Sequence, residues 1–203
     1  MHSINMKDNL NISSHEFWDN CYEHDNTGWD LGGPTPIFVD WCNNLDSSKK
    51  ICVPGAGNGY DPLYFSSKGH QVTAIDFAKS PIERLRKESK NKNINLECIH
   101  ADFFTLGEDF FNRFDYIIEY TFYCAISPKL RNKYIDIIYK LLKPGGELVS
   151  ILLPFTKDST EEGPPFLVNL KETIALFSNK FKLLESTNHS LSIKPRKGNE
   201  QFV

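Results

Sequence analysis

The chain has 203 residues, of which 40% are hydrophobic and 24% charged; this mixture is typical of one globular domain and excludes a disordered or collagen-like chain. Lysine and arginine number 23 against 26 aspartates and glutamates, so the net charge of −3 gives no indication of a nucleic-acid partner. No apolar run is long enough to span a membrane and no signal-peptide pattern opens the chain, so we expect a cytoplasmic protein. The 5 cysteines, without paired spacing, predict free thiols and no zinc site.

The first 46 residues precede any strand pattern and contain all 3 tryptophans. Ser13-x-x-Glu16 has the form of a capping box and predicts a helix with an aromatic side, formed by Phe17, Trp18 and Tyr22. A glycine-containing loop with Trp29 and a second short helix follow. We therefore expect a single domain over residues 1–203, in which residues 1–46 form a helical lid over a core of residues 47–203.

Strand and helix patterns alternate after this segment. Short apolar runs predict strands at residues 51–53, 71–75, 95–99, 114–120 and 147–153. Ser80-Pro81 predicts an N-cap and a first-turn proline for the second intervening helix, and further helices are expected at residues 128–142 and 170–177. The alternation predicts an α/β fold with a mostly parallel sheet, helices on both faces and strand-like segments at the C-terminus.

A glycine loop follows the first predicted strand and opens the next helix. Gly55, Gly57 and Gly59 are small enough to let the backbone approach a ligand closely at the carboxyl end of the sheet. Dinucleotide-dependent enzymes and methyltransferases share this feature, and an ordinary tight turn has the same appearance. The loop alone therefore does not identify a ligand.

Two aspartates stand at the ends of the next two predicted strands. Asp76 lies about 20 residues beyond the first glycine, where a carboxylate accepts hydrogen bonds from ribose hydroxyls. Asp102 ends the third strand and precedes Phe103, so a carboxylate for an exocyclic amine lies beside an aromatic ring for a purine face. Either aspartate alone could be a helix cap, but together with the glycine loop they predict a nucleoside site.

Several segments resemble one enzyme family. The phrase Leu141-Leu142-Lys143-Pro144-Gly145-Gly146-Glu147-Leu148 resembles the class I S-adenosylmethionine (SAM)-dependent methyltransferases. Three segments near the start of the chain resemble the opening of the thiopurine S-methyltransferase-like family, and within it the plant-type thiol, halide and thiocyanate methyltransferases. These segments are Phe17-Trp18-Asp19-Asn20-Cys21-Tyr22-Glu23, Gly28-Trp29-Asp30 and Gly33-Pro34-Thr35-Pro36. The resemblance continues through residues 53–57, 100–104, 122–126, 163–166 and 196–198. It implies a Rossmann-like class I methyltransferase sheet with an antiparallel C-terminal strand.

The resemblance also implies which residues form the site. Contacts with SAM or its product S-adenosylhomocysteine are implied for Trp18, Tyr22, Trp29, Gly55, Gly57, Asp76, Asp102, Phe103 and Tyr120. Tyr22 departs from the family pattern, because a second tryptophan is usual at that position. A pocket for the acceptor is implied for Trp18, Tyr123, Phe166 and Arg196. Arg196 either holds an anion or is a solvated residue of a basic run, and the aromatic residues of the first helix could instead be core.

Methyl transfer from a sulfonium is an in-line displacement, and a polarizable anion needs positioning and desolvation more than a strong base. No Ser/His/Asp or Cys/His set stands out, so we predict no catalytic residue and no metal ligand. The expected function is SAM-dependent methylation of a small thiol or hydrosulfide, with halide or thiocyanate as further acceptors. The alternatives are an aromatic-thiol (thiopurine-type) methyltransferase and a non-catalytic SAM-binding protein.

Two other functions fit the sequence less well. An NAD-dependent oxidoreductase would place its third loop glycine at Tyr60, and a nucleic-acid amine methyltransferase would carry an Asn/Asp-Pro-Pro-aromatic loop where Glu119-Tyr120-Thr121-Phe122 stands. We therefore expect a small-molecule thiol or anion as partner, without nucleic acid or membrane. The oligomeric state is open, with a monomer as the working expectation.

Overall fold

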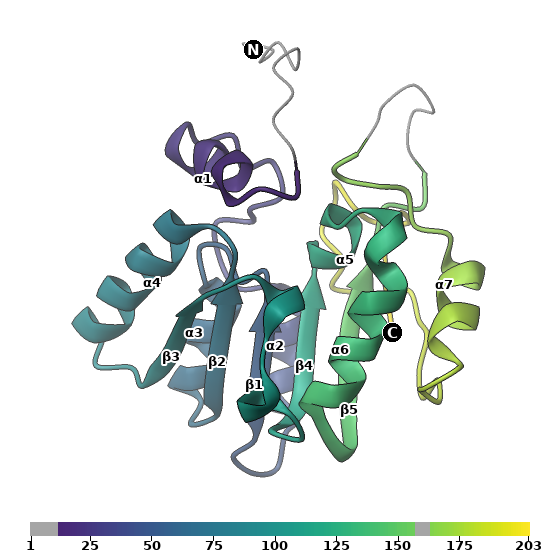
Figure 1. Cartoon of the computed structure of the whole chain (residues 1–203). Coiled ribbons are helices and arrows are strands. Elements are labelled where there is room, and N and C mark those ends of the chain that lie inside the picture. The colour runs from purple at the N-terminus through teal and green to yellow at the C-terminus, as the bar shows by residue number, and fades with distance from the viewer. Residues whose placement is uncertain (1–11, 157–162) are drawn as a thin grey trace.

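The computed structural model describes residues 12–156 and 163–203. A six-stranded sheet in the order β3-β2-β1-β4-β5-β6 forms its centre (Figure 1). The strands are β1 (Lys50–Pro54), β2 (Gln71–Asp76), β3 (Leu96–His100), β4 (Phe114–Tyr120), β5 (Leu142–Leu152) and β6 (Gln201–Phe202). The pairs from β3 to β5 are parallel and β6 runs antiparallel to β5, as predicted.

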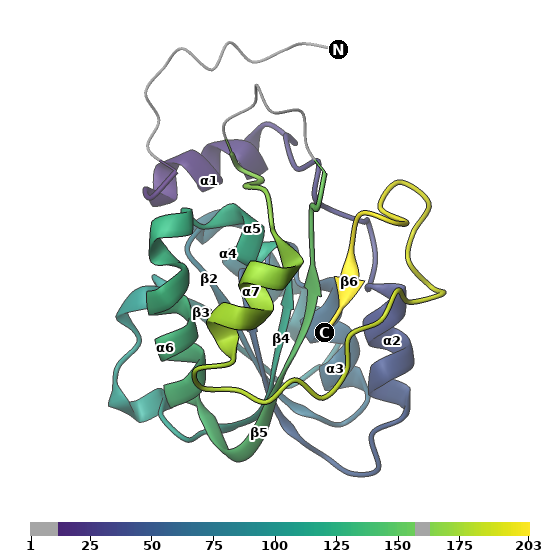
Figure 2. The same cartoon turned by 90° about the vertical axis from the view of Figure 1, so that its right-hand side faces the viewer.

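Helices cover both faces of the sheet. One layer contains α2 (Pro36–Asn43), α3 (Tyr60–Ser67) and α4 (Lys79–Asn91), and the other contains α6 (Arg131–Leu141) and α7 (Leu170–Phe177). Figure 2 shows α6 on one side of the strands and α2 and α3 on the other. Two further helices, α1 (His15–Glu23) and α5 (Phe122–Ala125), lie at the carboxyl ends of the strands, and short 3₁₀ turns occupy Phe103–Thr105, Glu108–Phe110 and Pro128–Leu130.

The centre of strand β4 is buried on both faces of the sheet. Ile117 and Ile118 are both 0% exposed, yet they belong to different cores: Ile117 packs on the α6 side and Ile118 on the α2 and α3 side. Successive side chains of a strand point to opposite faces, so helices on both faces bury consecutive apolar residues at the centre of the strand. On α6, Tyr134, Ile138 and Leu141 recur at helical spacing and face the sheet.

Two predicted helix starts are wrong. Helix α1 begins at His15 with Ser14 as its N-cap residue, one position after the Ser13 of the predicted capping box, and the Ser14 hydroxyl contacts the Glu16 carboxylate instead of a backbone N–H. Helix α4 begins at Lys79, so Ser80 lies within its first turn. The N–H of Ser80 donates to Oδ1 of Asp19 across 2.9 Å. A carboxylate distant in the sequence thus satisfies a free donor of this helix start.

The glycine phrase before β5 is also built differently from the prediction. Strand β5 begins at Leu142, and because Phe114 pairs with Leu142 while Tyr116 pairs with Glu147, the four residues 143–146 bulge out opposite a single residue of β4. Nζ of Lys143 contacts Asp115 at 2.5 Å within this bulge.

Two other predicted elements are shorter than expected. The predicted helix over 128–142 is a 3₁₀ turn followed by α6. Of the two predicted strand-like segments at the C-terminus, only β6 is a regular strand.

The predicted lid divides into two parts. Helix α2 belongs to the core, because Ile37 and Phe38 are 2% and 1% exposed and pack among residues of the sheet. Helix α1 lies instead above the carboxyl ends of the strands (Figure 1). The segment that covers these ends therefore stops before Pro36 rather than at residue 46.

Within the described residues, no helix has the length and apolar character needed to cross a membrane.

Candidate functional site

A cavity of about 520 Å³ opens at the carboxyl ends of the strands, beneath α1. The covering segment contributes Trp18, Tyr22, Gly28 and Trp29, and the strand ends contribute Gly55, Ile75, Asp76, Ala101, Asp102 and Phe103. The turn after β4 and the later chain add Thr121, Phe122, Cys124, Leu130, Leu153 and Arg196. The cavity is thus enclosed by segments from both halves of the chain.

The glycine loop is packed so closely that two of its positions require glycine. Gly55 has φ +60°, and a Cβ there would lie 2.7 Å from the Phe122 ring. Gly57 has φ +53°, and a Cβ there would lie 2.8 Å from the hydroxyl of Tyr22. Larger side chains would therefore combine an unfavourable left-handed backbone with a collision. The loop backbone lies in direct contact with the covering aromatic residue.

Asp76 connects the glycine loop to β2. Its Oδ2 accepts the N–H of Gly57 at 2.8 Å, and its Oδ1 accepts the N–H of Ala78 at 2.8 Å. Only 7% of the residue is exposed, and burial raises the pKa of Asp76 to about 6 against the opposing effect of these hydrogen bonds. The backbone of Phe77 adds a third hydrogen bond that lowers the pKa of this carboxyl, so of about four acceptor positions one stays open. Asp76 can therefore accept a ligand hydroxyl while it holds the loop.

Asp102 and Phe103 occupy the end of β3. Oδ1 of Asp102 accepts the N–H of Phe104 at 2.9 Å, so this carboxylate caps the first 3₁₀ turn as well as lining the cavity. Phe103 is 3% exposed, and its ring lies 5.5 Å from that of Phe122 in an edge-to-face arrangement. The cap interpretation and the site interpretation of Asp102 are thus compatible.

Three aromatic residues of the covering segment form one cluster. The Trp29 ring lies 5.6 Å from that of Trp18 and 5.8 Å from that of Tyr22, edge-to-face in both cases. Tyr22 is 7% exposed, burial raises its pKa, and the Arg84 guanidinium lies 5.7 Å from its ring. The cluster joins the loop after α1 to the glycine loop.

Arg196 lies in the lining of the cavity next to the covering segment. Its Nη2 donates to the carbonyl of Trp29 at 2.8 Å, and its guanidinium carbon lies 4.8 Å from the centre of the Tyr120 ring. Nη1 is buried without a hydrogen-bond partner. The solvated alternative for Arg196 is therefore wrong, because this guanidinium is fixed beside the cavity by the Trp29 carbonyl and the Tyr120 ring.

A buried carboxylate behind Tyr120 was not detected from the sequence. The Tyr120 hydroxyl donates to Oε2 of Glu200 at 2.8 Å, and the Ser192 hydroxyl donates to Oε1 at 2.6 Å. Glu200 is only 4% exposed. These bonds attach the C-terminal segment to the end of β4 and orient the ring on which Arg196 rests. No local pattern in the sequence marks this pairing.

The structure does not bring all predicted residues to the cavity. Gly57 and Tyr120 line an adjacent narrow space of about 80 Å³. Tyr123 is 2% exposed and packs toward α6 and α7, with its ring 5.5 Å from that of Tyr134. Phe166 is half-buried and donates its N–H to the carbonyl of Cys124 at 2.6 Å, outside the lining. Phe122 lines the cavity instead, since neighbouring residues of a helix such as α5 point in different directions.

The remaining polar groups of the cavity offer little acid–base chemistry. Burial raises the pKa of Cys124 to about 12, so its thiol is neutral near pH 7. The described lining residues include no histidine. All five cysteines are free thiols, as predicted, and among the described residues no group of three or more His, Cys, Asp or Glu side chains could hold a metal ion.

Comparison with known proteins identifies the family. The family model for thiopurine S-methyltransferase matches residues 13–202 of this chain. The chain belongs to the thiopurine S-methyltransferase family. Among curated members, "Probable thiol methyltransferase 2" of Arabidopsis thaliana is 34% identical over 194 residues, covering 91% of this chain and 82% of that protein. "Thiocyanate methyltransferase 1" of Brassica oleracea is 32% identical over 192 residues, with the same coverage of 91% and 82%.

The fold of this family member also matches solved methyltransferase structures. The 1,6-didemethyltoxoflavin-N1-methyltransferase of Burkholderia thailandensis, solved with 1,6-didemethyltoxoflavin and S-adenosylhomocysteine, superposes with a TM-score of 0.72 at 18% identity, covering 93% of this chain and 84% of that chain. The thiopurine S-methyltransferase family member described here therefore has the class I methyltransferase fold and is a methyltransferase. The predicted family and fold class are confirmed.

Proposed function

We propose that this protein transfers the methyl group of SAM to the sulfur of a small thiol or hydrosulfide, with halide and thiocyanate as further acceptors. The observation that carries the proposal is that the Asp76 carboxylate and the positively charged guanidinium of Arg196 line the same cavity. The Asp76 carboxylate suits the hydroxyls of a nucleoside, and the Arg196 guanidinium suits an anion. The plant relatives named thiol and thiocyanate methyltransferases support this pairing.

The residues present fit SAM. Asp76 would accept from the ribose hydroxyls, and Asp102 with Phe103 would take the adenine amine and ring face. Trp18, Tyr22 and Trp29, the aromatic cluster of the covering segment, would enclose the methionine part. A cavity of about 520 Å³ lies within the ordinary range for small-molecule sites.

When bound, SAM supplies an electrophilic methyl group on a sulfonium. The chain's own residues would contribute positioning, desolvation and charge. The apolar lining would exclude water from the acceptor anion, and the positive charge of the Arg196 guanidinium at the edge of the cavity would attract it. Alignment of this kind contributes on the order of 7–11 kcal/mol to a displacement. No general base is required if the acceptor enters as its anion.

The covering segment would act as a lid. Helix α1 and the loop that follows it contribute Trp18, Tyr22 and Trp29 to the lining of the cavity, and the contact between Arg196 and the Trp29 carbonyl connects the lid to the acceptor side. Closure would therefore sequester the sulfonium and orient the guanidinium in one step. The free thiols of the chain fit a reducing compartment, so we propose that the protein is located in the cytoplasm.

The decisive experiment measures S-adenosylhomocysteine release with bisulfide, methanethiol, iodide and a thiopurine. We expect sulfur anions to be methylated, with kcat/KM rising with pH toward a thiol pKa of about 8.5. Iodide does not titrate, so its kcat/KM should stay flat over the same range. Efficient methylation of a neutral amine with inert thiols would refute the proposal, and a pH profile shared by iodide and thiols would reveal an enzyme base instead.

A further inference from the structure

The loop of residues 193–199 brings Arg196 to the cofactor cavity, and a pair of side chains closes this loop at its base. The Ser192 hydroxyl donates to Oε1 of Glu200 at 2.6 Å, so the residues on either side of the loop are joined. Strand β6 follows directly, and there Phe202 pairs with β5 on one edge and forms a β-bridge on the other. The loop therefore ends at a fixed point of the sheet.

The second oxygen of Glu200 reaches a different part of the chain. Its Oε2 accepts the Tyr120 hydroxyl at 2.8 Å, at the carboxyl end of β4. Glu200 is 4% exposed, and a buried carboxylate is costly unless its oxygens are hydrogen-bonded. Because the two oxygens take hydroxyls from two separate segments, Glu200 fixes the base of the loop relative to Tyr120.

Tyr120 transmits this position to Arg196. The guanidinium carbon lies 4.8 Å from the centre of the Tyr120 ring, within the range in which an aromatic face attracts a cation. Burial raises the pKa of Tyr120, the Arg196 guanidinium opposes this rise, and the Glu200 carboxylate adds to it. Both charged groups therefore act on the same tyrosine.

Arg196 in turn holds the lid at a loosely packed point. Its Nη2 donates to the Trp29 carbonyl at 2.8 Å. At Gly28, Gly32 and Gly33, an added Cβ would meet no atom of the described residues within 4 Å. Since the backbone on both sides of Trp29 has this little packing, the bond from Arg196 contributes directly to the position of the lid.

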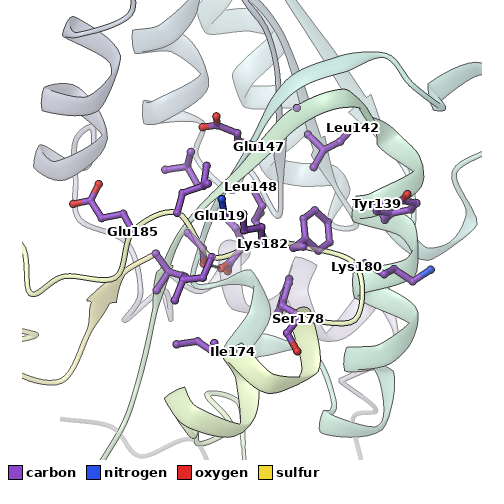
Figure 3. Close-up of a pocket in the computed structure, with 18 of the residues that line it drawn as sticks. Glu119, Tyr139, Leu142, Glu147, Leu148, Ile174, Ser178, Lys180, Lys182 and Glu185 are labelled. Carbon is purple, nitrogen blue, oxygen red and sulfur yellow. Dashed lines mark hydrogen bonds between the residues drawn. The ribbon is translucent and has the colours of Figure 1, made fainter.

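Glu200 itself touches no space that a ligand could fill. It is absent from the lining of the cofactor cavity, and also from that of a larger cavity of about 670 Å³ between β5, α6, α7 and the segment 178–185 (Figure 3). The larger cavity includes Phe202 and Val203 in its lining and shares no lining residue with the cofactor cavity. Any effect of Glu200 on a ligand must therefore pass through Tyr120 and Arg196.

We propose that Glu200 is a positioning residue of the methyltransferase site, which holds Tyr120 and the loop 193–199 together so that Arg196 meets both the lid and the acceptor anion. The acceptor part of this inference rests on the proposed function, whereas the lid part does not. Loss of the carboxylate would leave the Tyr120 hydroxyl without its acceptor and the loop open at its base. Glutamine would keep both contacts, because its amide oxygen can accept one hydroxyl and its amide nitrogen can donate to the other.

The test compares full-length Glu200→Ala, Glu200→Gln and Tyr120→Phe in calorimetry with S-adenosylhomocysteine and in kinetics with bisulfide and iodide. Glu200→Ala and Tyr120→Phe should each weaken cofactor-product binding and raise KM for both acceptors about 3- to 10-fold, the usual effect of one hydrogen bond. The kcat should change less than about twofold, because binding of the acceptor is lost rather than transition-state stabilisation. Glu200→Gln should recover most of the affinity.

A double variant and a matched control make the test specific. The variant with both Glu200→Ala and Tyr120→Phe should be no weaker than the weaker single variant, because the two changes remove the same hydrogen bond. Tyr64→Phe also removes one tyrosine hydroxyl, which donates to Asn43 at 2.9 Å away from both cavities, and should leave affinity and KM unchanged.

Four results would overturn the proposal. These are unchanged affinity and KM in Glu200→Ala, a lower Tm as its only effect, additive losses in the double variant, and failure of glutamine to restore binding, which would show that charge rather than position is needed. If the wild type methylates neither bisulfide nor iodide, the proposed acceptor is wrong. The titration with S-adenosylhomocysteine still decides the role of Glu200 in that case.

Discussion

The substitution Glu119→Gln should stabilise the protein at alkaline pH. Glu119 is 1% exposed, and burial raises its pKa from 4.5 to about 7 despite the hydrogen bonds from Ser150 and Tyr123. A glutamine keeps both contacts, because its amide oxygen can accept the N–H of Tyr123 and its amide nitrogen can donate to the Ser150 oxygen. The substitution therefore removes the titration and retains the packing.

The magnitude follows from the raised pKa of this carboxyl. The folded state binds the proton of Glu119 more tightly than the unfolded state, so the associated stability is full below pH 4.5 and is lost as pH rises through about 7. At 1.36 kcal/mol for each pKa unit, the loss is roughly 3 kcal/mol. The titratable groups around Glu119 are Tyr123, Cys124 and Tyr134, and because burial raises the pKa of each of them, they stay neutral between pH 5 and 8.

Urea unfolding of both proteins between pH 5 and pH 8 measures this difference. The free energy of unfolding of Glu119→Gln relative to wild type should increase with pH and reach roughly 3 kcal/mol near pH 8. Burial also raises the pKa of Asp61 and Asp76 to about 6, but these groups titrate in both proteins and cancel in the difference. Glu83→Gln, at a half-exposed ion pair with Lys79, serves as the control and should show little change. A pH-independent difference would refute the reasoning.

Three further predictions concern the cofactor cavity. Asp76→Ala should weaken S-adenosylhomocysteine binding in calorimetry by about 10- to 100-fold, the effect of losing charge-assisted hydrogen bonds, and equal affinity would contradict the ribose assignment. Arg196→Ala should raise KM for anionic acceptors and also weaken cofactor binding, because the contact of Arg196 with the Trp29 carbonyl is lost; unchanged cofactor affinity would show that this contact does not hold the lid. Removal of residues 1–34 should abolish turnover while the circular dichroism of the sheet persists, whereas normal methylation by the truncated protein would exclude a lid.

The predictable parts of the site depend on local patterns. Asp76 and Asp102 were found because each ends an apolar run, and the carboxyl ends of parallel strands lie at one edge of a sheet. Asp76 also illustrates the limit of this reasoning. Its hydrogen bond with Gly57 closes the loop onto β2, and no spacing rule distinguishes that role from ligand binding.

The parts that were missed depend on contacts between distant segments. Glu200 holds Tyr120 although 80 residues separate them, and Asp19 accepts from the first turn of α4 across 61 residues. The resemblance implied a pocket position for Tyr123, and the four residues of α5 are too few for a periodic pattern to show that Phe122 lines the cavity in its place. Such pairings exist only once the chain has folded.

The hydrogen bond between Arg196 and Trp29 joins residues 167 positions apart. During synthesis the strands β1 to β5 emerge before Arg196 and Glu200 do, so a nascent chain can pair most of its sheet while one side of the cavity is still inside the ribosome. Contacts of such long separation form late because closing a large loop costs more entropy. The cavity should therefore be completed in the last step of folding. A partly made chain would neither bind nor consume the cofactor.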